Sequence, residues 1–549
     1  MRKLFYTTAS IWLIYLSYGL SQEVEWVKKI VGNVHFLDKP FIETNSNSYC
    51  FGFNFLSDTI INIDNKIIDP LTTQKGFFVF RSNFSNELIK ITQPLSKNKI
   101  LIRDIALLNQ GYSLIIGEYY GLAIFDSVIL DKSGKLVGNG LFLIKYDTTG
   151  KLIWSYPIKY IDYGSAQGEA LTTDKNGNIY AAGLCGGRII LNSDTLSGCR
   201  GFILSTDSTG RTNWIKKIYG RIDGQSFSTN NMDIISDDLN HIAFVSNVAE
   251  SGKVGIDTTI FTARNSDIFI AMLNNSGKVL WSNLIGGTYF DEVNEVKSKN
   301  GIIYLSGHTT GNLQYRGEIL VKDSSSFVMA LVAETGNLMW IQTFGNASSP
   351  SIALTKLGEL VVSFSFNQPI SIFNKTIVPT LSEYSTFEYY SSDILILMLD
   401  HSTGSILWQT SINGMGNERY PTIATDSVNN IYIISFLQGR TELGNFNFNI
   451  PYGAFLAKIK LPTLSLKLED KNNLQISESE EFIKIRMSAK PHKSLLSCFN
   501  SIGEKLFTKD ILPLTEFVEL DKSTFTNGKY FCTIEHDGIT ETISFVINK

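Results

Sequence analysis

The sequence has few charged residues and lacks the short motifs of common catalytic and metal sites. Charged residues make up 18% of the 549 residues, and the formal net charge is −4. Because nucleic-acid binders usually carry a basic surface, this balance argues against a nucleic-acid partner. No Gly-rich phosphate loop ending in Lys and Ser or Thr occurs, and the 6 His and 5 Cys form no HExxH or CxxC spacing. We therefore expect no metal, no cofactor and no catalytic residue.

Proline is also scarce, whereas glycine and aromatic residues are frequent. The chain has 12 Pro against 43 Gly, 23 Tyr and 35 Phe, and hydrophobic residues reach 43%. That apolar content excludes general disorder, and the aromatic residues favour β-structure. Since a chain of this length rarely folds around one core, we expect several domains or one repeat architecture.

Long apolar runs are absent after the N-terminus. Arg2 and Lys3 precede an apolar stretch from Leu4 to Leu16, and the small residues Gly19 and Ser21 follow. This order is typical of a cleaved signal peptide, and the stretch is short for a membrane span. We therefore expect residues 1–21 to be removed and the mature protein to be extracellular or on the outer-membrane surface, reached through the periplasm.

Five cysteines are an odd number for an oxidising compartment. Cys185 and Cys199 lie 14 residues apart across one expected loop and could pair. Cys498 and Cys532 lie in two apolar strands near the C-terminus, and Cys50 is left over. Disulfides and buried free thiols both remain open.

Tryptophan marks an internal repeat. After the signal peptide it occurs at Trp26, Trp154, Trp214, Trp281, Trp340 and Trp408, and the gaps from the second onward are 60, 67, 59 and 68 residues. A typical copy, from Phe202 to Trp214, has an apolar strand, a polar turn with Gly and a second strand, which is a β-hairpin pattern. A second hairpin, such as the one from Leu171 to Gly183, precedes each copy. The repeat therefore predicts four strands in about 60 residues.

Repeated four-stranded units favour a β-propeller. The last repeat strand, Ala454 to Lys460, has no Trp strand after it, and the strand from Glu25 to Gly32 could supply one. Joining them predicts a closed ring, which leaves no exposed sheet edges. We therefore predict an all-β fold with a seven-bladed β-propeller over residues 22–461, and we expect the Trp side chains to pack between adjacent blades.

The repeat also resembles a known family. The segments from Ser266 to Ala271, from Gly277 to Trp281 and from Gly301 to Gly307 are similar to the propeller repeats of secreted Bacteroidetes proteins, called seven-bladed β-propeller repeats. The resemblance covers about residues 24–461. It implies a fold and says almost nothing about a ligand.

The C-terminal part has a different texture. Residues 462–476 are expected to form a linker, and residues 477–549 contain several short alternating strands with turns at Asn527-Gly528 and Asp537-Gly538. About 70 residues of this kind predict a small immunoglobulin-like β-sandwich.

This tail resembles the C-terminal sorting domain of the type IX secretion system, although the family's usual Pro-Asn-Pro near the domain start is absent. The resemblance is carried by the segment from Leu496 to Lys505, by the Gly-x-Tyr start of a strand and by the ending in apolar residues and Lys, which include Gly503, Glu504, Lys505, Gly528, Tyr530 and Lys549. It implies export by that machinery and cleavage by a sortase-like peptidase. The remaining protein would be released or attached to surface lipopolysaccharide.

Two sets of residues are weak candidates for a site. Residues 379–392 lengthen one repeat with aromatic side chains that could stack on a sugar or peptide, namely Tyr384, Phe387, Tyr389 and Tyr390. Acids near the expected inner strands could serve a paired-carboxylate glycosidase but are read as solvated loop acids: Asp233, Asp237, Asp238, Asp291, Glu292 and Glu295. The turn at 174–178 resembles half a calcium loop and is read as a hairpin turn.

These observations predict a surface or secreted propeller that binds a glycan or a protein without catalysis. The alternative is a secreted hydrolase that acts on polysaccharide or peptide in the propeller funnel.

Overall fold

The computed structural model divides the chain into two compact units, Met1–Pro462 and Thr463–Lys549, which are described separately. The structure describes residues 23–31, 35–36, 39–45, 48–56, 61–63, 66–68, 76–83, 88–92, 94–96, 99–108, 111–131, 139–198, 200–220, 232–248, 252–345, 347–348, 350–372, 375–381, 391–461, 475–478, 482–486, 494–500, 505–512, 517–536 and 539–547. The predicted signal peptide lies outside these residues. Within them, no helix is both long and apolar enough to cross a membrane.

The first unit is all-β and consists of antiparallel sheets, each named here after its innermost strand. The β3 sheet contains β2 (His35–Phe36), β3 (Phe41–Thr44), β4 (Ser48–Leu56), β7 (Gly76–Asn83) and β8 (Leu88–Thr92). The β10 sheet contains β10 (Ile100–Leu107), β11 (Ser113–Tyr119), β14 (Gly140–Tyr146) and β15 (Leu152–Ser155). The β16 sheet contains β16 (Ile158–Thr173), β17 (Ile179–Leu191), β19 (Gly201–Thr206) and β20 (Thr212–Gly220).

The later sheets repeat this order. The β21 sheet contains β21 (Met232–Ser236), β22 (Ile242–Val248), β25 (Asp267–Leu273) and β26 (Val279–Gly286). The β27 sheet contains β27 (Asp291–Lys299), β28 (Ile302–Thr309), β31 (Ser325–Val332) and β32 (Leu338–Thr343). The β33 sheet contains β33 (Ser351–Leu354), β34 (Leu360–Phe366), β37 (Asp393–Leu399) and β38 (Ile406–Ile412).

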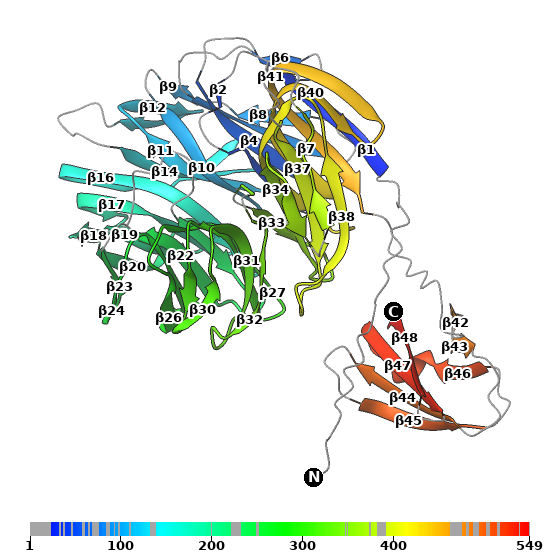
Figure 1. The fold of residues 1–549 in the computed structure, drawn as a ribbon. Coiled ribbons are helices and arrows are strands. Elements are labelled where there is room, and N and C mark those ends of the chain that lie inside the picture. The colour runs from blue at the N-terminus through cyan, green and yellow to red at the C-terminus, as the bar shows by residue number, and fades with distance from the viewer. Residues whose placement is uncertain are drawn as a thin grey trace. The chain divides into compact units, whose positions relative to one another are not determined.

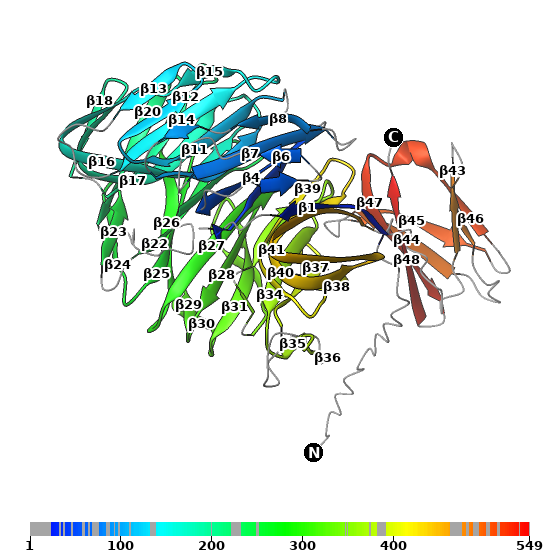
Figure 2. The same cartoon turned by 90° about the horizontal axis from the view of Figure 1, so that it is seen from above.

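The two ends of the first unit meet in one sheet. The β39 sheet contains β39 (Asn417–Thr425), β40 (Ile431–Leu443), β41 (Phe446–Lys460) and β1 (Glu23–Val31). Strand β1 pairs with β41 from Glu23 opposite Lys460 to Val31 opposite Gly453, so the dark blue strand lies beside the orange one (Figures 1 and 2). The innermost strands contact one another in the order β3, β10, β16, β21, β27, β33 and β39, and β39 contacts β3. The fold is therefore propeller-like, with the innermost strands around a shared centre.

Short inserts between the second and third strands of a sheet reach back to the preceding sheet, which the sequence did not indicate. The hairpin of β23 (Lys253–Ile256) and β24 (Thr259–Thr262) pairs with β20. The hairpin of β29 (Leu313–Tyr315) and β30 (Glu318–Val321) pairs with β26. The hairpin of β5 (Ile61–Ile63) and β6 (Lys66–Ile68) pairs with β1. The remaining short strands are β9 (Leu95–Ser96), β12 (Leu122–Phe125), β13 (Val128–Asp131), β18 (Asp194–Ser197), β35 (Ile370–Ile372) and β36 (Lys375–Ile377). The inserts therefore join neighbouring sheets through main-chain hydrogen bonds.

The second unit has two antiparallel sheets. One contains β42 (Gln475–Glu478), β43 (Phe482–Arg486) and β46 (Phe517–Asp521). The other contains β45 (Lys505–Ile511), β44 (Ser494–Asn500), β47 (Gly528–His536) and β48 (Ile539–Ile547), and a short 3₁₀ helix covers Lys522–Thr524. Strand β42 begins at Gln475, so the expected linker of residues 462–476 ends too late by two residues. Polar composition hid this strand because it has only four residues.

Candidate functional site

All the innermost strands of the first unit line one central cavity of about 320 Å³. Lining residues stand four and two residues before the turn in β10 (Asp104 and Ala106), β21 (Asp233 and Ile235) and β39 (Thr422 and Ala424), and Glu295 and Lys297 alternate in the same way on β27. In β10, β27 and β39 the pairing register shifts just before the first of these positions, at Asp104, Glu295 and Thr422. A β-bulge of this kind rotates the next side chain relative to its neighbours. The bulges therefore help to turn the polar side chains toward the cavity.

Four polar side chains on the innermost strands each bind a main-chain N–H of the next strand. The N–H of Leu171 donates to Asp104 Oδ2 (2.8 Å), that of Val296 to Asp233 Oδ2 (2.7 Å), that of Ile352 to Glu295 Oε2 (2.8 Å) and that of Ile423 to Ser351 Oγ (3.2 Å). Asp104 Oδ1 and Asp233 Oδ1 accept from the N–H of the residue that follows each. These bonds satisfy main-chain donors that face the cavity and would otherwise lack a partner.

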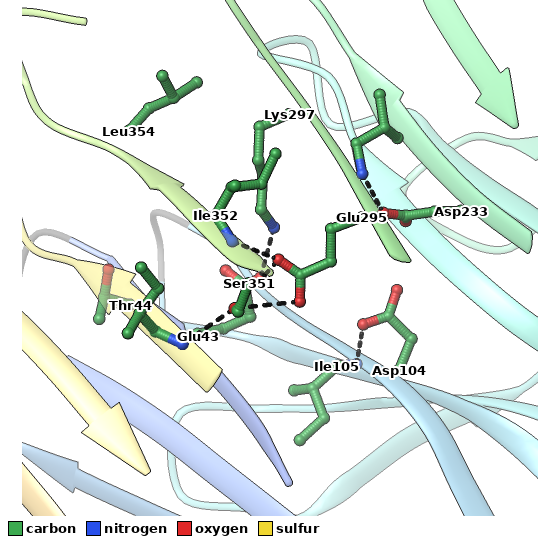
Figure 3. Close-up of polar contacts among 12 residues, drawn as sticks. Glu43, Thr44, Asp104, Ile105, Asp233, Glu295, Lys297, Ser351, Ile352 and Leu354 are labelled. Carbon is green, nitrogen blue, oxygen red and sulfur yellow. Dashed lines mark hydrogen bonds and ion pairs between the residues drawn. The ribbon is translucent and has the colours of Figure 1, made fainter. Parts of the chain in front are cut away.

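Two ion pairs connect β27 with β3 and with Lys39, two residues before β3. Lys39 Nζ lies 2.8 Å from Glu295 Oε1, and Lys297 Nζ lies 3.7 Å from Glu43 Oε1. Figure 3 shows Glu295, Lys297 and Glu43 pointing toward one another, with Asp104 and Asp233 on neighbouring strands. Strands β3 and β27 are not neighbours in the order of contacts, so these pairs bridge separate parts of the cavity wall.

Burial and charge act on these groups in opposite directions. Burial raises the pKa of Asp104 well above its usual range, and the Asp233 charge adds to this effect. Burial also raises the pKa of Asp233 and of Glu43, which nearby Lys297 offsets only in part. For Glu295, burial is outweighed by the charges and hydrogen bonds of Lys39 and the charge of Lys297, so its pKa is lowered. The surrounding acids raise the pKa of Lys297 against its burial, so the lysine stays protonated.

The cavity has more acidic than basic groups. Four carboxyls, those of Glu43, Asp104, Asp233 and Glu295, face two ammonium groups, so full ionisation gives −4 + 2 = −2. Asp104 and Asp233 have no basic partner within ion-pair distance among the described residues. The cavity therefore offers polar and acidic groups to a bound molecule.

The structure separates the acids that the sequence singled out. Asp233 and Glu295 line the cavity, whereas Asp291 is fully buried at the opposite end of β27 and Asp237 holds a turn. Asp238 Oδ2 accepts from the N–H of Asn300. The reading of all these acids as solvated is therefore wrong for the buried ones. Sequence reasoning missed Lys39, Glu43, Asp104 and Lys297, although aligning the repeats on their turns would have pointed to Asp104.

The turn at 174–178 closes a hairpin. Asp174 Oδ1 accepts from the N–H groups of Asn176 and Asn178, and Oδ2 accepts from Asn178 Nδ2 and the Tyr180 hydroxyl. Gly177 takes φ +82°, which favours glycine. The carboxylate is thus occupied by its own turn, as the interpretation as a hairpin requires.

The repeated tryptophans connect one sheet to the next. Trp281 Nε1 on β26 donates to Ala333 O (2.8 Å), and a Cβ on Gly336 would lie 3.1 Å from its ring. Trp154, Trp214 and Trp340 donate in the same way to carbonyls of the following sheet. Trp26 lies 5.8 Å from Tyr49 of the β3 sheet, measured between ring centroids, and Trp408 is buried. These contacts place the side chains between sheets.

Several of the remaining residues that the sequence singled out lie outside the described residues. These include the aromatic candidates Tyr384, Phe387, Tyr389 and Tyr390, together with Cys199, Gly503, Glu504 and Lys549. Cys185 is disulfide-bonded, and its pairing with Cys199 stays a prediction. Cys50 is a buried free thiol.

In the second unit, Cys498 and Cys532 form a disulfide between β44 and β47. Tyr530 is buried, and its hydroxyl donates to Thr526 O at 2.9 Å. Gly528 opens β47, and Lys505 opens β45 with an exposed side chain. These motif residues therefore lie at strand starts or in the core of the unit.

No protein-family model and no curated protein matches the chain. Among solved structures, a protein of unknown function from Dyadobacter fermentans DSM 18053 aligns with 81% of this chain and 100% of its own, at 10% identity and a TM-score of 0.37. A structure from a study of two prolyl endopeptidases aligns with 85% of this chain but 57% of its own, at 8% identity and a TM-score of 0.34. A mutant of the GH43 protein BlXynB from Bacillus licheniformis aligns with 95% and 89%, at 9% identity and a TM-score of 0.26. Similarities this low carry no conclusion about the function of this chain.

Proposed function

We propose that this chain is an exported binding protein whose first unit closes into a seven-bladed β-propeller around a ligand-binding central cavity. The ligand class is a glycan or a protein. The pairing of β1 with β41 and the cycle of contacts among the innermost strands support a closed ring. Closure would keep the cavity walls rigid, which favours a preformed binding site.

One observation carries the choice of binding over catalysis. The cavity carboxyls of Asp104, Asp233 and Glu295 all accept main-chain N–H groups of a neighbouring strand. These main-chain hydrogen bonds hold each carboxyl in one direction relative to the cavity, which favours a preformed binding site. Carboxyl groups held in this way can accept hydrogen bonds from a polar ligand without changing their own position.

A hydrolase that uses the same cavity is the second candidate. Asp104 and Glu295 have pKa values shifted in opposite directions, by burial and by lysine charge respectively, and such a split is what an acid and a base in glycoside hydrolysis require. This candidate predicts turnover in the same experiment.

Purified protein, without residues 1–21, tested on glycan and peptide arrays separates the two. We expect saturable binding by at least one ligand, which is then recovered intact. Cleavage of the bound ligand would overturn the binding proposal and favour the hydrolase.

The proposal includes export by the type IX route, followed by removal of the tail by a sortase-like peptidase and release or attachment to surface lipopolysaccharide. The Cys498–Cys532 disulfide supports an oxidising compartment. Deleting residues 477–549 should leave the protein in the periplasm. Unchanged surface display of the truncated protein would contradict this route.

A further inference from the structure

The central cavity contains two carboxyl groups that the ion pairs leave uncompensated. Lys39 pairs with Glu295 and Lys297 with Glu43, at 2.8 and 3.7 Å. The remaining acids, Asp104 on β10 and Asp233 on β21, are half-buried and line the same cavity. One strand, β16, lies between β10 and β21 in the order of contacts, and the charge of Asp233 acts on Asp104.

Both carboxyls keep room for further donors. A carboxylate offers about four acceptor positions on its two oxygens. Asp104 uses two of them for the N–H groups of Ile105 and Leu171, and Asp233 uses two for those of Ile234 and Val296. These bonds fix the direction of each carboxyl toward the cavity. A ligand that donates hydrogen bonds can add to this arrangement without breaking it.

We propose that the cavity binds a small organic diamine through its two protonated amino groups, one at Asp104 and one at Asp233. The amino groups supply the two positive charges that the cavity lacks, and they donate charge-assisted hydrogen bonds to fixed acceptors. A cavity of about 320 Å³ can hold a short diamine. This inference rests on the proposed binding function and gives it a ligand class.

Binding should be coupled to protons. Burial favours the neutral forms of Asp104 and Asp233, and a bound cation favours the ionised forms. The other charged groups that face them are Glu43 on β3, Glu295 and Lys297 on β27, and Lys39. Diamine binding should therefore release protons wherever the two carboxyls are partly protonated in the free protein, and it should weaken as the pH falls further.

The experiment is calorimetric titration of the purified full-length protein with putrescine, and with butanediol as a neutral ligand of the same length. We expect one putrescine per protein, no butanediol binding, and proton release when buffers of different ionisation enthalpy are compared. Asp104→Asn and Asp233→Asn each keep one of the two acceptor oxygens and remove the negative charge, and each should weaken putrescine binding roughly 10- to 100-fold. The exposed Asp323→Asn is the matched control and should bind like the unmodified protein.

Several results would overturn the inference. These are absence of putrescine binding, binding that is unchanged in both folded cavity variants, binding without proton release, and binding of Ca²⁺ that is lost in the same variants. Because proton release is measured on the unmodified protein, the test does not depend on the variants folding. If a glycan or peptide still binds without turnover while putrescine does not, the diamine inference fails and the proposed function stands. If a ligand is cleaved, the proposed function fails.

Discussion

Glu418 on β39 should make the stability of the first unit depend on pH. Its side chain is fully buried, and neither carboxyl oxygen has a hydrogen-bond partner in the described part of the chain. Burial raises its pKa from 4.5 to about 8, and the charge of Asp393 raises it further, whereas the polar Thr441 hydroxyl, whose own hydrogen bond goes to Asn413 O, lowers it in part. Glu418 is therefore neutral in the folded protein at neutral pH, whereas in the unfolded chain it is ionised.

The sign and size follow from this difference. The folded state binds the proton more tightly, so the stabilisation is fully present below about pH 4.5 and is lost as the pH rises through about 8. The shift of 8 − 4.5 = 3.5 units corresponds to about 5 kcal/mol of unfolding free energy. Glu418→Gln keeps the shape and removes the titration. The variant should therefore gain about 4 kcal/mol relative to the unmodified protein between pH 5 and pH 9.

Urea unfolding followed by tryptophan fluorescence measures this change. Apart from Trp12 in the predicted signal peptide, every Trp lies between residues 26 and 408, so the signal reports the first unit. Glu442→Gln, at an exposed position on the neighbouring strand β40, is the control and should show no such pH trend. A free-energy difference between Glu418→Gln and the unmodified protein that stays within about 1 kcal/mol from pH 5 to pH 9 would refute the reasoning.

Three further changes have expected outcomes. Cys498→Ser should lower the unfolding free energy of the second unit by about 3 to 4 kcal/mol, because the disulfide closes a loop with a sequence separation of 34. The unfolding transition of the second unit, followed by circular dichroism, measures this loss. Gly336→Ala should destabilise the first unit by more than about 1 kcal/mol, because φ is +66° and the new Cβ would press on Trp281. An unchanged midpoint of urea unfolding, followed by tryptophan fluorescence, would argue against this packing. A double-mutant cycle of Lys39→Met and Glu295→Gln should give a coupling free energy of unfolding of about 1 to 3 kcal/mol, since the two side chains are only 12% and 11% exposed. A coupling near zero would contradict the ion pair.

The regular part of the fold could be predicted from the sequence because packing repeats. Each Trp from Trp154 to Trp408, such as Trp214 near the start of β20, follows the same apolar strand and Gly turn, and hairpins form at the expected places. The pairing of β1 with the last repeat strand also follows from counting strands. Local hydrophobic patterns suffice for these features, since each depends on neighbours in sequence.

The cavity could not be read in the same way because its groups come together from distant strands. Lys39 and Glu295 are 256 residues apart, and no local pattern links them. Asp104 occupies the repeat position of Asp233, four residues before the turn, so aligning the repeats on their turns would have found it. Glu43 and Lys297 share the position two residues before the turn, but their opposite charges and the plain Ala at equivalent positions conceal it.

The central claim is that the closed propeller binds a ligand in its cavity without converting it. The most direct measurement is recovery and mass analysis of the tightest array ligand after equilibrium binding to the unmodified protein and to Asp233→Asn. The account predicts saturable binding by the unmodified protein, weaker binding by the variant and an intact ligand from both. A cleaved ligand from the unmodified protein, or equal affinity in both proteins, would contradict it.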